Sequence, residues 1–313
     1  MREISLSDIE DAASHIYDPV IRTPIVQLDD NLYLKLESLQ PTGSFKLRGA
    51  RNTLRSISSG QLGSGVWTVS AGNAALGVAY AAHRAGVPCS VMVVDTAPAT
   101  KLDALHRLNA RIIPAPYEEC WRTVETHASD RMTGAFIHPF DDDRFIAGNG
   151  TAGLEILDAL PDVNGVVAAV GGGGLLAGVA AAINARRPDV EIFAAEPETA
   201  SPFAVSLANN RVSTFEGWQR SLVDGAGGRS VLPSMWPLLS RLAAGSIVVS
   251  LAAVAAAMKL VAERCHVLAE GAAACAVAAA RTGRVRGKVV AIVSGGNIDL
   301  PAFASLVGAA KER

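Results

Sequence analysis

Short runs of β-branched and apolar residues alternate with alanine-rich stretches along most of the chain. Between residues 65 and 139, four such runs predict strands: VWTVS (66–70), SVMVV (90–94), RIIPA (111–115) and AFIHP (135–139). The stretches that follow the first three runs, at 73–86, 100–110 and about 118–129, carry apolar residues at helical spacing. This alternation indicates a compact α/β unit.

A second series follows, with a helix predicted at about 151–160. Continuous apolar runs predict buried strands at GVVAAV (165–170), EIFAAEP (191–197) and KVVAIVSGG (288–296), and helices are expected at 175–187, 251–264 and 270–281. Runs of this kind are typical of parallel strands covered on both faces. We therefore expect two doubly wound α/β domains with a cleft at the carboxyl ends of their strands. The expected division is a large domain of residues 1–64 and 140–313 and a small domain of residues 65–139.

Residues 165–183 contain no charged residue and imitate a membrane span. Four consecutive glycines and the flanking sequence instead favour a buried strand, a tight turn and a buried helix, so no membrane association is expected. The N-terminus has no apolar core of a signal peptide.

Composition narrows the class of protein further. A formal net charge of -2 without a basic run argues against nucleic acid as a partner. The four cysteines form no CxxC pair and no zinc-like cluster with histidine, so a reducing cytoplasm is expected.

Three glycine-rich turns follow predicted strands. GGGG (171–174) precedes a predicted helix, where backbone N–H groups can approach a phosphate, although close strand–helix packing also explains glycines there. SAGN (70–73) is a second such turn and suits a carboxylate, although Ser and Asn are also ordinary helix caps. SGGN (294–297) adds a hydroxyl at the end of a third strand.

Lysine is rare in this chain, with six residues: Lys35, Lys46, Lys101, Lys259, Lys288 and Lys311. Lys46 lies in PTGSFKLRGA, between an aromatic residue and an apolar one, shortly after a Gly-Ser pair. A phosphate-binding turn, a carboxylate-binding turn, a hydroxyl and an amine together suit a phosphorylated aldehyde and an amino acid. The amine would form a Schiff base, because burial lowers the pKa of a lysine and frees its lone pair.

Seven segments resemble the threonine dehydratase and serine racemase branch of the fold type II pyridoxal 5'-phosphate (PLP) enzymes. They occur in the order of the family over nearly the whole chain: LKLESLQPTGSFKLRGA (34–50), SAGN (70–73), HPFDDDRFIAGNGT (138–151), VGGGGLLAG (170–178), AEPE (195–198), VDG (223–225) and SGGNID (294–299). The resemblance implies a fold like that of the tryptophan synthase β subunit, with the active site between two domains. No length remains for the C-terminal regulatory domain of biosynthetic threonine dehydratases.

The resemblance also implies roles for individual residues. Lys46 would carry the cofactor as a Schiff base, with Phe45 beside its ring and Asn73 on its phenolic oxygen. Gly171, Gly172, Gly173 and Gly174 would hold the phosphate, and Ser294 would face the pyridine nitrogen. The substrate carboxylate would bind to Ser70, Ala71, Gly72, Asn73 and Ala74, chiefly through backbone N–H groups.

The chain also departs from the pattern of the family. Ala74 and Leu76 replace the usual histidine and glutamine, which predicts a larger and more apolar pocket unless Leu76 turns inward to pack its own helix. Ala71 stands where the racemases have a serine acid/base, so racemisation is disfavoured. Pro202 stands at about the position of an acidic ligand in the cation loop of the family, so no metal is expected and Glu196 is interpreted as structural.

The resulting prediction is an ammonia-lyase that converts an L-β-hydroxy amino acid such as threonine or serine to a 2-oxo acid and ammonia. A neutral Ser294 leaves the ring nitrogen unprotonated, which favours elimination. The alternatives are a β-replacement enzyme of the cysteine synthase kind and a PLP-binding carrier or regulator without turnover. A nicotinamide dehydrogenase fits least, because the chain lacks GxGxxG with its later acidic residue. A homodimer is expected from the habit of the family.

Overall fold

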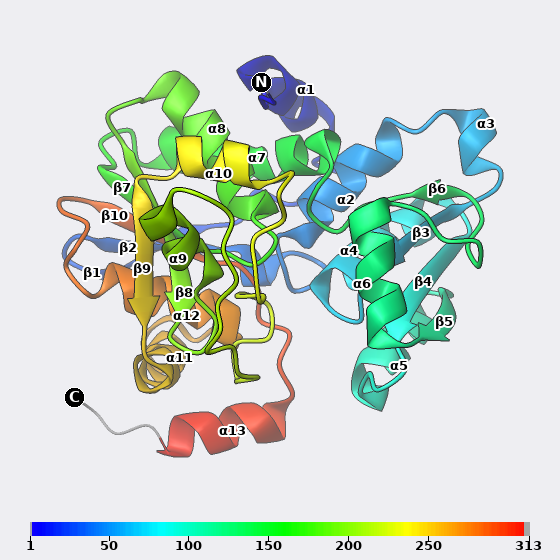
Figure 1. Ribbon diagram of the computed structural model, residues 1–313. Helices are drawn as coiled ribbons and strands as arrows, with labels where there is room; N and C mark the ends of the chain where they lie inside the picture. The colour runs from blue at the N-terminus through cyan, green and yellow to red at the C-terminus, as the bar shows by residue number, and fades with distance from the viewer. Residues whose placement is uncertain (1, 310–313) are drawn as a thin grey trace.

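The computed structural model describes residues 2–309, with the backbone alone described for residues 99–101. Two sheets with helices packed on them lie side by side (Figure 1). The larger sheet has the strand order β1-β2-β10-β7-β8-β9, and every neighbouring pair is parallel except the hairpin β1–β2. Its strands are β1 (Ile25–Asp29), β2 (Leu32–Leu36), β7 (Gly165–Ala169), β8 (Glu191–Pro197), β9 (Gly245–Val249) and β10 (Val289–Val293).

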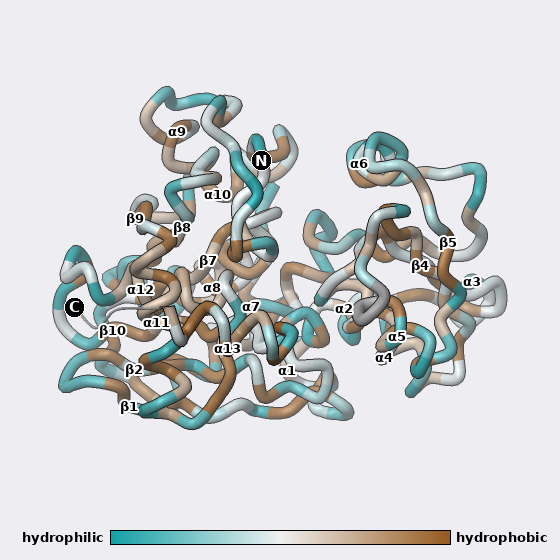
Figure 2. The backbone as a smooth tube through the Cα atoms, turned by 90° about the horizontal axis from the view of Figure 1, so that it is seen from below, coloured by the Kyte–Doolittle hydropathy of each residue, from teal (hydrophilic) through white to brown (hydrophobic). Residues whose placement is uncertain are grey.

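Both faces of the larger sheet are buried, as the continuous apolar runs predict. Along β7, Val166 and Ala168 belong to the core on one face, whereas Val167 and Ala169 belong to the core on the other. One layer of helices contains α1 (Leu6–His15), α7 (Asp143–Ala159), α8 (Gly174–Arg186) and α10 (Trp236–Leu242); the opposite layer contains α11 (Leu251–Cys265), α12 (Gly271–Ala280) and α13 (Leu300–Ala309). The short helix α9 (Pro202–Asn209) packs on β9. In Figure 2, which colours each residue by hydropathy, the hydrophilic segments lie mainly in the outer turns.

The smaller sheet takes all its strands from residues 66–136, within the segment predicted as the small domain. Its parallel strands follow the order β5-β4-β3-β6 and are β3 (Val66–Val69), β4 (Cys89–Val94), β5 (Arg111–Ala115) and β6 (Ala135–Phe136). The helices α4 (Asn73–Ala85) and α5 (Ala99–Arg107) cover one face, and α6 (Tyr117–Thr126) covers the other. The predicted α/β alternation is therefore confirmed in this region.

Helix α2 (Lys46–Arg55) packs against α4 of the smaller unit and α7 of the larger one; η1 (Glu37–Leu39) and α3 (Ser59–Leu62) flank it in sequence. Glycines permit this close packing. A Cβ atom on Gly77 would lie 3.0 Å from the carbonyl of Lys46, and one on Gly148 would lie 2.5 Å from the carbonyl oxygen of Arg48. The first turn of α2 is thus fixed from both sides.

Helix α7 begins eight residues earlier than the sequence analysis predicts, at Asp143 instead of Thr151. Asp142 caps it by accepting hydrogen bonds from the backbone N–H groups of Arg144 and Phe145. Glycine is a poor helix former, so the glycines in the first half of α7 do not predict a helix. They are needed for close packing, because a Cβ atom on Gly150 would lie 2.9 Å from the Gly178 carbonyl oxygen in α8.

The uncharged stretch at 165–183 folds as strand β7, a glycine turn and most of helix α8. Among the described residues, no helix is both long and apolar enough to cross a membrane.

Candidate active site

Lys46 is the first residue of α2, and its side chain is only partly exposed. Its Nζ donates a hydrogen bond of 2.6 Å to the carbonyl oxygen of Pro139 and lies 5.2, 5.9 and 5.5 Å from the ring centroids of Phe45, Phe140 and Phe145. Burial lowers the pKa of Lys46 to about 8, and the negative charge of Glu270 opposes this shift. A substantial fraction of this amine is therefore neutral and nucleophilic near physiological pH.

The carboxyl end of β10 is bonded directly to the segment that precedes Lys46. Ser44 forms an antiparallel bridge with Gly295, and the backbone N–H of Phe45 donates to the carbonyl oxygen of Ser294 at 3.0 Å. The structure therefore brings Ser294, which is buried, into the same site as the amine.

Asn73 starts helix α4 and joins this site from the smaller sheet. Its Nδ2 donates to Glu270 Oε1 at 2.7 Å, and its Oδ1 accepts from Asn297 Nδ2 at 2.8 Å. A Cβ atom on Gly295 would lie 2.5 Å from Glu270 Oε1, so this glycine makes room for the carboxylate. The turns SAGN and SGGN thus meet at one point.

Glu270 is a site residue that the sequence analysis missed. It is buried at the start of α12, and its charge acts on Lys46. An acidic residue immediately before ten uncharged helical residues was the available signal, because a buried charge needs a partner.

The glycine turn 171–174 leads from β7 into α8. Gly173 has a φ of +90°, which favours glycine, and Gly174 is the first residue of the helix. A side chain on Gly172 would overlap the Phe140 ring, and a Cβ atom on Gly171 would lie 2.9 Å from the Gly225 carbonyl oxygen. Close packing requires these glycines. The turn also leads into the positive end of a helix, where a phosphate group would be favoured.

The remaining predicted substrate residues lie at the start of α4. Ser70 Oγ accepts from the backbone N–H of Gly72 at 3.1 Å, Ala71 is partly buried, and Ala74 is buried. Leu76 packs partly buried against the apolar core of the smaller sheet. Leu76 thus packs its own helix, which is the alternative to a place in the pocket wall. Any enlargement of the substrate pocket therefore depends on Ala74.

Glu196 lies outside this cluster. Its carboxylate accepts from the backbone N–H groups of Phe203 and Ala204, at 2.8 Å each, and from Ser246 Oγ at 2.6 Å. The two backbone bonds place the carboxylate at the start of α9, the Ser246 bond ties it to β9, and burial raises its pKa.

Comparison with known proteins shows the family to which the chain belongs. Residues 16–295 match the family of pyridoxal-phosphate dependent enzymes. The L-threonine ammonia-lyase of Thermotoga maritima is 38% identical over 95% of this chain and 76% of its own length. The catabolic L-threonine dehydratase of Staphylococcus aureus strain N315 is 35% identical over 97% of this chain and 92% of its own length.

Among solved structures, maize serine racemase superposes with a TM-score of 0.88 at 32% identity and covers 97% of both chains. The amine of Lys46 suits the aldehyde of PLP, and the turn before α8 suits its phosphate. The chain belongs to the fold type II pyridoxal-phosphate-dependent enzymes, in the branch of the threonine dehydratases and serine racemases, and its cofactor is PLP.

Proposed function

We propose that this protein is an ammonia-lyase that eliminates the β-hydroxyl group of an L-β-hydroxy amino acid, such as threonine or serine, and releases a 2-oxo acid and ammonia. The observation that carries the proposal is the Lys46 amine, whose pKa burial lowers to about 8, at the junction of three strand ends. The 38% sequence identity to an L-threonine ammonia-lyase over 95% of the chain supports the same reaction class.

When bound, PLP supplies an electron sink for the α-carbon of the substrate. Lys46 would hold the cofactor covalently, yield it to the amino group of the substrate and then remove the α-proton as a neutral amine. Gly171 to Gly174 would hold the cofactor phosphate at the start of α8. Phe45 would lie beside the cofactor ring, and the hydroxyl of Ser294 would donate a hydrogen bond to the unprotonated ring nitrogen without adding charge.

Asn73 would orient the phenolic oxygen of the cofactor, since Glu270 and Asn297 already fix its amide. Ser70, Ala71, Gly72, Asn73 and Ala74 would bind the substrate carboxylate through backbone N–H groups at the start of α4. No hydroxyl is available at position 71, so protonation of the opposite face of the α-carbon is slow and elimination outpaces racemisation.

We also propose a domain division, an oligomeric state and a cellular location for this protein. Residues 65–139 would form the small domain, and residues 1–64 and 140–313 the large one, with the site between them. We further propose a cytoplasmic homodimer that binds no nucleic acid, since closed two-fold assemblies are the commonest oligomers.

The test is an assay of the holoenzyme on a panel of L-β-hydroxy amino acids, with ammonia and 2-oxo acid measured together. We expect steady release of both in a 1:1 ratio from threonine or serine. Bound PLP without turnover on any member would indicate a carrier or regulator. Incorporation of an added thiol without release of ammonia would indicate β-replacement.

A further inference from the structure

The buried imidazole of His138 organises the turn at residues 138–141. Its Nδ1 accepts hydrogen bonds from the backbone N–H groups of Phe140, at 3.2 Å, and Asp141, at 2.7 Å. Its Nε2 lies 3.1 Å from the carbonyl oxygen of Val124, in the last turn of α6. Because Nδ1 is the acceptor, the proton is on Nε2, and the ring donates to Val124.

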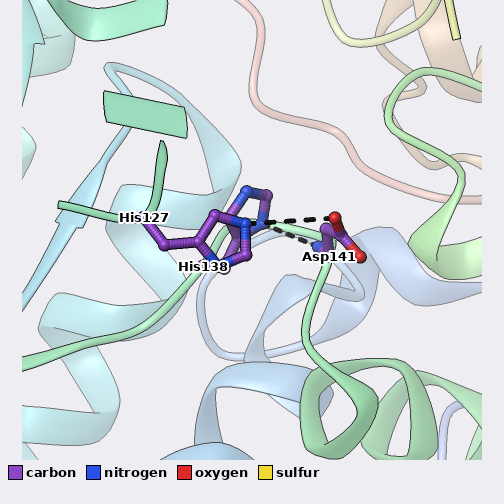
Figure 3. A group of neighbouring side chains, drawn as sticks. All are labelled: His127, His138 and Asp141. Carbon is purple, nitrogen blue, oxygen red and sulfur yellow. Dashed lines mark hydrogen bonds and ion pairs between the residues drawn. The ribbon is translucent and has the colours of Figure 1, made fainter. Parts of the chain in front are cut away.

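His138, His127 and Asp141 lie close enough to suggest a cation site, with their ligand atoms within 4.8 Å of one another (Figure 3). The hydrogen bonds argue against it. Both nitrogens of His138 are already used, and Asp141 pairs with Arg2 and accepts from Ser234 Oγ at 2.6 Å. Burial, and next the neighbouring His127, lower the pKa of His138 to about 4, so this ring is neutral.

The turn that His138 fixes contacts the site at two points. The carbonyl oxygen of Pro139 accepts the hydrogen bond from Lys46 Nζ. The next residue, Phe140, covers the glycine turn, since side chains on Gly172 or Gly174 would collide with its ring and its backbone respectively. One imidazole therefore sets the position of the acceptor for the amine and of the aromatic ring at the predicted phosphate turn.

We infer that His138 is a positioning residue for the elimination reaction: by accepting the N–H groups of Phe140 and Asp141, it aims the Pro139 carbonyl at Lys46 and holds Phe140 against the glycine turn. Its second bond, to Val124, ties this turn to α6 on the smaller sheet. The charge of Lys46 acts on the imidazole, but the hydrogen bonds of His138 go to Phe140, Asp141 and Val124. The inference rests on the proposed role of Lys46.

Two substitutions separate the functions of the two nitrogens. In His138→Asn the amide oxygen takes the place of Nδ1, so the two backbone N–H groups keep their acceptor. In His138→Gln the longer amide can still reach Val124, but the acceptor near Phe140 and Asp141 is lost. We expect His138→Gln to lower kcat by about 10- to 100-fold, with KM changed less, because misplacement by about 1 Å has effects of this size.

A second measurement follows Lys46 directly. The rate at which PLP attaches to the cofactor-free full chain should rise with pH, with a midpoint near 8 in the wild type. The Pro139 carbonyl favours the charged amine, so His138→Gln should lower this midpoint by about half a unit, whereas His138→Asn should keep it. Loss of packing alone would expose the amine and move the midpoint upward, because burial is what lowers this pKa.

Controls make the outcome decisive. His127→Asn removes the ring that lies against His138 in a tilted arrangement, at a centroid distance of 4.5 Å, and keeps a residue that tolerates the φ of 58° there. It should leave kcat and the midpoint unchanged. Phe140→Leu is a milder substitution that can be used if His138→Gln fails to fold. It should weaken PLP affinity by about threefold or more and leave the pH midpoint of PLP attachment unchanged.

Equal kcat and midpoint in His138→Asn and His138→Gln would overturn the inference, as would unchanged PLP affinity in Phe140→Leu. Neither result would affect the proposed function, which fails only if the wild type releases no 2-oxo acid or if PLP attaches elsewhere than Lys46.

Discussion

The first turn of helix α2 carries two cations two residues apart, Lys46 and Arg48, in different surroundings. Arg48 is fully buried, and its guanidinium donates to Glu37 and Glu155 at 2.7 Å each. Burial alone would lower the pKa of Arg48, but the two carboxylates hold it above its ordinary value. Lys46 instead lies among aromatic rings and donates to a carbonyl, and burial lowers its pKa to about 8.

The comparison shows that burial alone does not make a cation reactive. Carboxylates with well-placed oxygens fix the charge of Arg48, and a neutral carbonyl does not fix the charge of Lys46 in the same way. Lys35 is an intermediate case: burial lowers its pKa as well, but Glu37 and Glu155 oppose this shift, and Lys35 contacts Glu155 and donates to the Thr23 carbonyl at 2.7 Å. The ionic cluster of Arg48, Glu37, Glu155 and Lys35 therefore holds the helix, and the helix presents Lys46.

The largest expected effect is on the reactive member of the pair. Lys46→Met keeps the apolar stem of the side chain and removes the amine. Turnover of threonine or serine should fall by at least about 10³-fold, since both covalent attachment and proton removal are lost. Steady-state release of 2-oxo acid measures this effect, and circular dichroism should show an intact fold. A loss of less than tenfold would place the base elsewhere.

Substitution of Arg48, the structural cation of the pair, should lower stability. Arg48→Met takes the guanidinium away from the buried carboxylates of Glu37 and Glu155, of which Glu155 keeps its contact with Lys35, so the free energy of unfolding should fall by about 3–5 kcal/mol. Urea denaturation measures it. Arg51→Met, on the same helix, removes an exposed bond to the Asp18 carbonyl and should stay within about 0.5 kcal/mol of the wild type. Similar losses in both variants would contradict the assigned difference.

The different pKa values of Lys46 in the folded and unfolded chain also predict that stability depends on pH. The unfolded chain binds a proton on Lys46 up to its ordinary pKa of 10.5, whereas the folded, cofactor-free chain releases it near 8. The unfolded state thus binds more protons between these values, and stability should rise with pH in that window by about 1–3 kcal/mol. Urea midpoints of the cofactor-free wild type, compared with Lys46→Met across pH 8–10.5, isolate this contribution. Parallel curves for the two proteins would refute it.

A smaller effect concerns substrate choice. Ala74 is buried at the start of α4, and Leu76 packs against the small core, so the space left by the missing histidine depends on position 74. Ala74→His should shift the kcat/KM ratio of a bulkier 3-hydroxy amino acid to serine by about tenfold toward serine. Ala85→His at the far end of the same helix is the control. If Ala74→His leaves the substrate ranking unchanged, the enlarged-pocket hypothesis is wrong.

Much of the fold could be predicted, because the strands of both sheets that are buried on two faces read as continuous apolar runs. The hairpin β1–β2 escaped this criterion. Its strands carry polar residues, including Lys35, whose charge is compensated by Glu155 at a distance of 120 residues in sequence. The local pattern of hydrophobic and polar residues cannot predict a partner so far away in sequence. The first half of α7 was missed for a related reason, since Gly148 and Gly150 favour a helix there only because other helices approach them.

The candidate site divides in the same way. Lys46, Asn73, Ser294 and the glycine turn lie in motifs that the sequence displays directly. The contributions of Glu270 and His138 depend on hydrogen bonds with residues far along the chain or on a turn conformation, and neither can be read from local spacing.

Borohydride reduction of the yellow holoenzyme, followed by peptide mapping, tests the central claim that Lys46 is the reactive cation. Reduction makes the lysine–PLP linkage permanent, so the attached residue can be identified by mass. We expect the pyridoxyl group on Lys46 alone and none on the buried, carboxylate-paired Lys35. Its presence on Lys35 or on any lysine other than Lys46 would contradict the assignment of the site.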